Sequence, residues 1–101
     1  MAKKRIAWTK EARADFRATL EFYNDRNGSS TYSRKLAEQV FKAIEKLQDN
    51  NHLGIRTSDP EVRVLIKGAF SIFYELKEDM ILVLIIWDSR RNPDELRKYL
   101  P

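Results

Sequence analysis

Four cationic side chains have the type and spacing that suggest chemistry. Arg63 and Lys67 are four residues apart in a run that alternates in polarity, so they share one face if that run is a strand. Arg90 and Arg91 come just after another apolar run. If the two runs are neighbours in a sheet, the four cations converge near one edge, where they suit a phosphate backbone or an acidic peptide. The alternative is that they only solvate the surface.

Candidates for proton transfer are few. Tyr74 and Tyr99 are candidate general acids or bases, or platforms for stacking, although such tyrosines more often belong to a core or its rim. Asp88 stands two residues before Arg90 and is better placed to orient an arginine than to act as a base. His52, the single histidine, lies in a polar stretch, where we expect it to be exposed.

The composition excludes several kinds of site. The chain has no cysteine, which excludes disulfide frameworks, thiolate nucleophiles and cysteine-based zinc sites. It also lacks a Gly-rich phosphate loop, a dinucleotide fingerprint and a spacing typical of metal ligands, so we expect no metal and no cofactor. Nineteen Lys and Arg against fifteen Asp and Glu give a net charge of +4, which permits an acidic partner without identifying one.

Length and hydropathy indicate one domain, residues 1–101, located in the cytoplasm. The chain has 101 residues, of which 43% are hydrophobic, enough for one core of modest size. Its basic start is followed by charged residues rather than by the apolar stretch of a signal peptide. The longest apolar run, residues 80–87, is far shorter than the roughly 20 residues that span a bilayer, so we expect no membrane partner.

The first half of the chain predicts a short strand and two helices. Residues 5–8 form a strand candidate, and Thr9 caps a helix that runs to about residue 26 and stops at Asn27-Gly28. Ser29 or Ser30 caps a second helix to about residue 48, with apolar residues at helical spacing. Because about three residues join the two helices, they should form an antiparallel hairpin.

The second half predicts a meander of three antiparallel strands. After a loop at residues 49–60, the strands cover residues 62–67, 70–76 and 80–87. The last strand is apolar on both faces, with Ile81, Val83 and Ile85 on one face and Leu82, Leu84 and Ile86 on the other, which is typical of an interior strand. A short C-terminal helix begins at Asn92, with Pro93 in its first position.

Together these elements predict an α+β fold in two layers. The helix hairpin must bury its apolar stripe, and the sheet offers the one large surface for it. The last strand needs cover on both faces while the helices cover one, so the other face should need a partner.

Taken in order, four segments of the chain resemble the RelE/ParE superfamily of bacterial type II toxin–antitoxin toxins. The first is a strand, a Trp-Thr cap and the start of a helix. The others are the hairpin end with its Gly54 loop, two meander strands, and the run that ends in Arg-Arg-Asn-Pro. The segments are Ile6–Phe16, Ile44–Leu47, Val62–Leu65 with Phe70–Tyr74, and Ile85–Pro93. Their order covers nearly the whole chain and implies a two-layer fold of the RelE/ParE kind.

The resemblance implies a toxin that inhibits growth and is neutralised by a cognate antitoxin. ParE-like members bind and poison DNA gyrase without breaking bonds themselves, whereas RelE-like members are enzymes that cleave messenger RNA on the translating ribosome. The long second helix favours the ParE-like reading. An end without a dense set of Lys, Arg and Tyr departs from the nuclease pattern, so the RelE-like activity is the alternative. A third reading is an inactive module that only binds antitoxin.

The two activities imply different roles for the same residues. In a RelE-like nuclease, the four cations would stabilise the pentavalent phosphate of the transition state, with Tyr99 as the proton-transfer group. In a ParE-like toxin, the same cations would bind the target or the antitoxin. The cations are Arg63, Lys67, Arg90 and Arg91.

Overall fold

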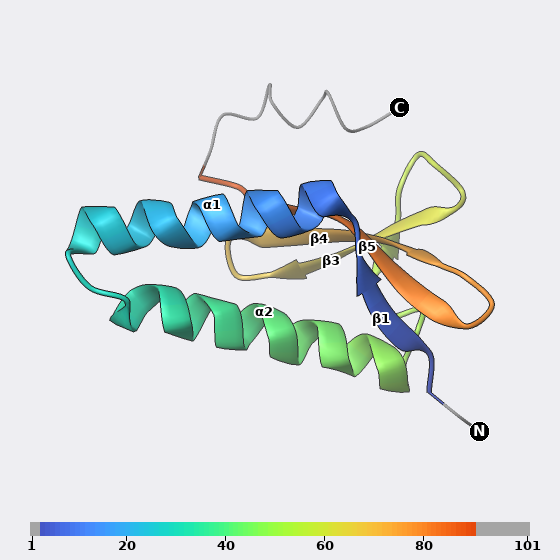
Figure 1. Cartoon of the computed structure of the whole chain (residues 1–101). Helices are drawn as coiled ribbons and strands as arrows, with labels where there is room; N and C mark the ends of the chain where they lie inside the picture. Colours follow the sequence, from blue (N-terminus) through green and yellow to red (C-terminus); the bar gives the residue numbers. More distant parts are fainter. Residues whose placement is uncertain (1–2, 91–101) are drawn as a thin grey trace.

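In the computed structural model, which describes residues 3–90, two helices pack against a five-stranded sheet (Figure 1). The described elements are β1 (Arg5–Trp8), α1 (Lys10–Asn27), α2 (Thr31–Asp49), β2 (Ile55–Arg56), β3 (Val62–Lys67), β4 (Phe70–Leu76) and β5 (Met80–Asp88). This order confirms the predicted α+β fold with its helix hairpin and meander. The short helix predicted from Asn92 lies outside the described residues.

The helix hairpin begins and turns where the sequence predicts. The Thr9 hydroxyl accepts a hydrogen bond from the Ala12 N–H at 3.0 Å and so caps α1. Gly28 ends α1 with φ at +68°, a left-handed conformation that glycine adopts without steric cost. Ser30 precedes α2, although its side chain makes no capping hydrogen bond. α1 and α2 then run side by side in opposite directions (Figure 1).

The strand order in the sheet is β1-β5-β4-β3-β2. β5 lies between β1, to which it is parallel, and β4, to which it is antiparallel, so the prediction of an interior strand is confirmed. β2 lies inside the segment predicted as a loop, and it pairs Ile55 with Val64 and Arg56 with Arg63. A strand of two residues is too short to show an alternating pattern, which is why the sequence did not reveal it.

A register shift in β5 changes which side chains share a face. Phe73 pairs with Ile85 but Tyr74 pairs with Val83, so Leu84 is an extra residue. Beyond the shift the alternation is offset. Ile86 joins Val83 in the helix-facing cluster, and Ile85 lies in the other cluster. The predicted sets of faces were therefore wrong after Leu84, because alternation holds only while the ladder is regular.

Apolar side chains are buried in separate clusters. The largest joins both helices to the sheet and includes Phe16, Val40, Ile72 and Val83. Another is built from strand residues and contains Val62, Phe73, Ile85 and Trp87, each 6–8% exposed. The second face of the sheet is therefore not open at its centre, contrary to the prediction from sequence.

Candidate functional site

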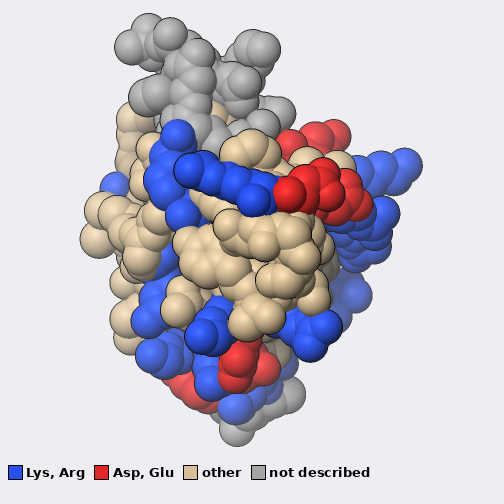
Figure 2. All heavy atoms as spheres, turned by 90° about the vertical axis from the view of Figure 1, so that its left-hand side faces the viewer, with Lys and Arg blue, Asp and Glu red and all other residues tan. Residues whose placement is uncertain are grey.

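Two of the predicted cations, Lys67 and Arg90, lie at the same end of the sheet. Lys67 pairs with Phe70 in β3–β4, and Phe70 pairs with Asp88 at the end of β5, two residues before Arg90. The Ser89 N–H donates to the carbonyl of Ala69 at 2.7 Å, which ties the segment after β5 to the turn between β3 and β4. Figure 2 views this end of the molecule, where many basic and some acidic side chains border an uncharged surface.

Arg63 does not join them. It lies opposite Tyr74, four residues before Lys67, which corresponds to about 13 Å along a strand. Its Nη1 donates to the carbonyl of Gly54 at 2.8 Å and lies 3.5 Å from that of His52. The predicted convergence of the four cations on one site is therefore not observed. Arg91 and Tyr99 lie outside the described residues.

Tyr74 and Arg63 together hold the loop between α2 and β2 against the sheet. The Tyr74 hydroxyl donates to the carbonyl of Asn51 at 3.0 Å and accepts from the N–H of Gly54 at 2.9 Å. Burial raises the pKa of Tyr74, which makes it a poor acid or base at neutral pH. His52 is exposed on the same loop. These contacts give Tyr74 a structural role.

Asp88 and Arg90 form a clamp at the end of β5. The Arg90 Nε and Nη2 donate to the two carboxylate oxygens of Asp88, each at 2.9 Å, and the Arg90 backbone N–H also donates to Asp88 at 2.9 Å. Burial alone would raise the pKa of Asp88, but the hydrogen bonds from Arg90 and Tyr23 and the charge of Arg90 together outweigh it and hold this pKa below its usual range. The prediction that Asp88 orients an arginine agrees with this geometry.

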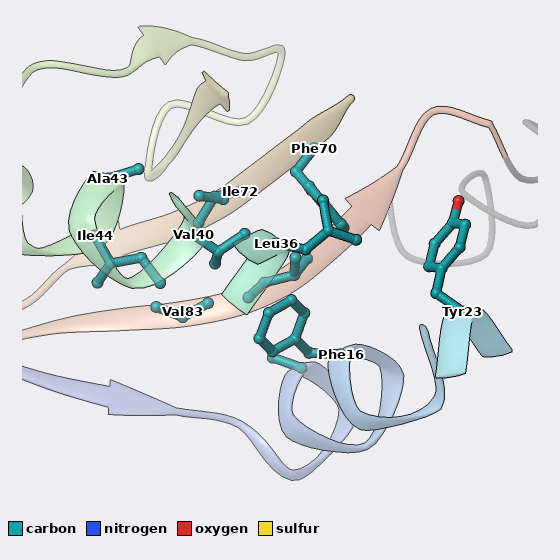
Figure 3. Close-up of a cluster of buried hydrophobic side chains, with 11 residues drawn as sticks. Phe16, Tyr23, Leu36, Val40, Ala43, Ile44, Phe70, Ile72 and Val83 are labelled. Carbon is teal, nitrogen blue, oxygen red and sulfur yellow. The ribbon is translucent and has the colours of Figure 1, made fainter. Parts of the chain in front are cut away.

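Two tyrosines from the helix hairpin complete the clamp. The hydroxyl of Tyr23 in α1 donates to Asp88 at 2.9 Å, and the Arg90 guanidinium lies 4.5 Å from the centre of the Tyr23 ring. Figure 3 shows Tyr23 at the end of the buried cluster, with its hydroxyl pointing away from the apolar side chains. In α2, the hydroxyl of Tyr32 accepts from Arg90 Nη1 at 2.8 Å. We call Tyr23, Tyr32, Asp88 and Arg90 the clamp cluster.

Sequence reasoning did not link these tyrosines to a site. Tyr23 and Tyr32 both fall on apolar helical stripes, which predicts burial but says nothing of a hydroxyl's partner. Tyr32 is 38% exposed rather than buried. The available signal was Asp88, a carboxylate at the end of an apolar strand, since a buried charge needs several donors.

A pocket of about 790 Å³ opens beside the clamp cluster. Residues of α1, the hairpin turn and the end of β5 line it. The described lining residues are Ala18, Thr19, Phe22, Tyr23, Arg26, Asn27, Tyr32, Asp88 and Arg90. The pocket therefore combines aromatic walls with two arginines.

The chemistry of the clamp cluster suits binding rather than proton transfer. The hydrogen bond with Asp88 raises the pKa of Arg90, and burial followed by the hydrogen bond to Asp88 raises the pKa of Tyr23. At neutral pH, Arg90 and Asp88 are thus charged and Tyr23 is neutral, and none of them is poised to exchange a proton. No group of His, Cys, Asp and Glu within residues 3–90 could hold a metal ion.

The helices that the structure describes are too polar or too short to cross a membrane.

Comparison with known proteins identifies relatives of the chain. The family model described as "ParE toxin of type II toxin-antitoxin system, parDE" matches residues 6–93. No curated protein matches the sequence. A chain of the chromosomal ParDE toxin–antitoxin system from P. aeruginosa is 24% identical, with a TM-score of 0.74 over 85% of this chain and 96% of that one. A chain of the YoeB dimer from Staphylococcus aureus is 13% identical, with a TM-score of 0.58 over 83% and 94%. At these identities, the two structures support the fold.

Proposed function

Because the chain belongs to the ParE toxin family of type II toxin–antitoxin systems, we propose that it inhibits growth by binding and poisoning DNA gyrase, without breaking bonds itself. The family makes the chain the toxin of such a system and a cognate antitoxin its partner. We propose gyrase as the target because ParE-like members of the superfamily bind and poison it. Since gyrase acts on chromosomal DNA, the proposal also places the toxin in the cytoplasm.

The observation that carries this proposal is the set of structural hydrogen bonds that the candidate arginines and tyrosine make. A ribonuclease of the RelE kind needs a group that takes a proton from the 2′-OH of the RNA and another that protonates the leaving oxygen. Within residues 3–90, three of the predicted candidates instead make structural hydrogen bonds: Arg90 to Asp88, Arg63 to the carbonyl of Gly54, and Tyr74 to Asn51. Such groups bind and position, but they do not shuttle protons.

For the binding residues, we propose the basic end of the molecule, which we define by Lys67 and Arg90, and we extend the proposal to Arg91, which follows Arg90 in the sequence. Lys67 is exposed at the end of β3, and the Arg90 side chain is 40% exposed. Arg63 would act indirectly, by holding the loop of Gly54 in place. This basic end suits an acidic surface on a protein target.

A supercoiling assay tests the target. Purified toxin is added to DNA gyrase, relaxed plasmid and ATP, and we expect loss of supercoiled product with accumulation of cleaved DNA. In parallel, the toxin is added to ribosomes translating a defined messenger RNA. Cuts in the messenger RNA together with normal supercoiling would support the RelE-like alternative and refute the gyrase proposal. The antitoxin, added in equimolar amount, should restore supercoiling.

Expression of the toxin without its antitoxin tests the remaining reading. We expect growth to stop and the cells to filament, because a poisoned gyrase blocks replication. Unchanged growth with soluble, folded toxin would leave an inactive module that only binds antitoxin.

A further inference from the structure

We propose that the pocket beside the clamp cluster receives an Asp or Glu side chain from a segment of the cognate antitoxin, with an apolar neighbour of that residue packed on the pocket's aromatic wall. The pocket has a volume of about 790 Å³. The inference rests on the toxin having an antitoxin and not on gyrase being its target.

Arg90 supplies the recognition of the carboxylate. Its guanidinium has five N–H donors, of which Nε, one on Nη1 and one on Nη2 bond to Asp88 and Tyr32. Within residues 3–90, one donor on Nη1 and one on Nη2 are left for a ligand. Arg90 already binds the Asp88 carboxylate through two nitrogens, Nε and Nη2. The remaining donors on Nη1 and Nη2 could bind the two oxygens of a second carboxylate in the same paired way.

The clamp cluster prepares Arg90 for this role. Asp88 fixes one edge of the guanidinium, Tyr32 holds Nη1, and the ring of Tyr23 supports its plane at 4.5 Å. A long side chain that is already immobilised loses little conformational freedom when a ligand binds. Since Asp88 balances the charge of Arg90, the second cation of the pocket, Arg26, provides the net attraction for an acidic ligand.

The wall of the pocket favours a protein segment over a nucleic acid. Phe22, which is 55% exposed, and Tyr32, which is 38% exposed, line the pocket together with Ala18. An apolar side chain next to an acidic one would cover this exposed surface. A nucleic acid would instead need a track of cations that follows its phosphates. The described lining offers two cations, Arg26 and Arg90, together with one carboxylate, Asp88.

Binding of the full-length cognate antitoxin, measured by calorimetry on purified toxin variants, tests the proposal. Arg26→Glu places a negative charge in the pocket, and we expect the Kd to rise about 10- to 100-fold. Arg34→Glu is the matched control, since Arg34 is exposed on α2 and does not line the pocket; we expect a change below about 3-fold. Phe22→Asp should weaken binding about as much as Arg26→Glu, because it removes the apolar wall and repels the carboxylate.

A second variant separates geometry from charge. Arg90→Lys keeps a cation beside Asp88 but removes the paired donors, so we expect about a 10-fold higher Kd at unchanged net charge. If Arg90→Lys proves to be unfolded by circular dichroism, Arg26→Glu and Phe22→Asp still decide the question, because neither side chain belongs to the clamp cluster. A Kd that stays within 3-fold of the native toxin in both of those folded variants would overturn the proposal.

The acidic residue is then found by charge reversal. Each Asp and Glu of the antitoxin is changed to Lys, and one such change should restore the affinity for the Arg26→Glu toxin to within about 3-fold of the native pair. If no change restores it, the pocket does not bind an antitoxin carboxylate. If a 20-base-pair DNA duplex binds the native toxin and loses affinity for the same variants, the pocket serves nucleic acid instead. The supercoiling assay is independent of each of these outcomes.

Discussion

At the scale of single residues, Asp88 is the charge on which the end of the sheet depends. It is 2% exposed and accepts hydrogen bonds from the Tyr23 hydroxyl and from the backbone and side chain of Arg90. A carboxylate removed from water in this way is stable only while its donors remain in place. The clamp cluster is therefore a structural joint between the helix hairpin and β5 as well as a wall of the pocket.

The lowered pKa of Asp88 predicts a specific sensitivity to acid. Because the folded-state pKa lies below the value of about 3.9 in an unfolded chain, protonation favours unfolding. The contribution of Asp88 to the free energy of unfolding is complete above that value and is lost as the pH falls through the folded-state pKa. Asp88→Asn should cost about 2 kcal/mol at pH 7 and make stability flatter below pH 4.

Urea denaturation at pH values from 7 to 2.5, with the native toxin and Asp88→Asn side by side, measures this. Asp49→Asn is a suitable control, since that carboxylate is exposed and pairs with Lys3 on the surface. Equal slopes of stability against pH in the native toxin and Asp88→Asn would show that Asp88 does not carry the acid sensitivity.

Tyr74 and Gly54 form a second contact between a loop and the sheet, and it leaves no room for a larger residue than glycine at position 54. A Cβ on Gly54 would lie 2.7 Å from the Tyr74 ring and 2.9 Å from the carbonyl oxygen of Val64, and that backbone atom cannot simply move aside. We expect Gly54→Ala to cost about 1–3 kcal/mol through overpacking. Tyr74→Phe should cost a similar amount, since it leaves the buried N–H of Gly54 without its acceptor.

Chemical denaturation compares these variants with Tyr32→Phe, which removes a hydroxyl from an exposed side chain and should cost less than about 1 kcal/mol. A Tyr74→Phe variant as stable as Tyr32→Phe would mean that the loop is held mainly by Arg63. This joint also bears on function. Because Arg63 binds the same loop, we expect Arg63→Ala to lower the free energy of unfolding, so its toxicity has to be compared with its stability.

At the scale of elements, the cap of α1 also connects the helix to the sheet. The Thr9 hydroxyl accepts from the Ala12 N–H and donates to the carbonyl of Leu84, both at 3.0 Å, at the point where the register of β5 shifts. We expect Thr9→Ala to lower the free energy of unfolding by about 1–2 kcal/mol, and Thr9→Ser to recover most of it.

Ser30 provides the matched control for the cap. It stands at the start of α2, but its hydroxyl makes no capping hydrogen bond, so Ser30→Ala should change the free energy of unfolding by less than about 0.5 kcal/mol. Thermal and urea unfolding of Thr9→Ala, Thr9→Ser and Ser30→Ala distinguish the two caps. Equal losses from both alanine variants would mean that the effect is helix propensity alone.

Elements with a clear period could be predicted from the sequence. The spacing of apolar residues gave both helices, and alternation gave β3, β4 and β5, with bounds within a residue or so of those observed. What failed depended on pairing between distant segments. The two residues of β2 are a strand only because they pair with β3, and Leu84 is an extra residue only relative to the pairing of β5 with β4. Neither feature therefore has a pattern in the local sequence.

The candidate site was predictable in part for the same reason. Asp88 two residues before Arg90 implied a local ion pair, and the structure contains it. Arg63 was expected beside Arg90, but strand order and length separate them along the sheet. Tyr23 and Tyr32 reach Asp88 and Arg90 across more than fifty residues of sequence, a link that only the packing of the hairpin on the sheet creates.

At the scale of the whole molecule, the arrangement of charge matters more than its sum. The net charge is only +4, yet Figure 2 shows more basic than acidic side chains around an uncharged surface at the end where the hairpin turns. A field of this kind steers an acidic partner to one end and falls off with ionic strength. The antitoxin and the target would compete for that end if both approach it, which provides a direct route to neutralisation.

Charge reversal at opposite ends of the molecule tests this arrangement. Lys67 lies at the basic end, whereas Lys10 begins α1, about 26 Å of helix away from the hairpin turn. Lys67→Glu and Lys10→Glu change the net charge equally, and both sites are exposed, so both proteins should fold. We expect Lys67→Glu to raise the toxin concentration that halves gyrase supercoiling about 5- to 10-fold and to weaken its dependence on salt, while Lys10→Glu changes it less than 2-fold.

Equal loss in the two variants would mean that net charge, rather than the basic end, attracts the target. A larger loss in Lys10→Glu would place the target surface at the opposite end, near β1, and leave the basic end to the antitoxin alone.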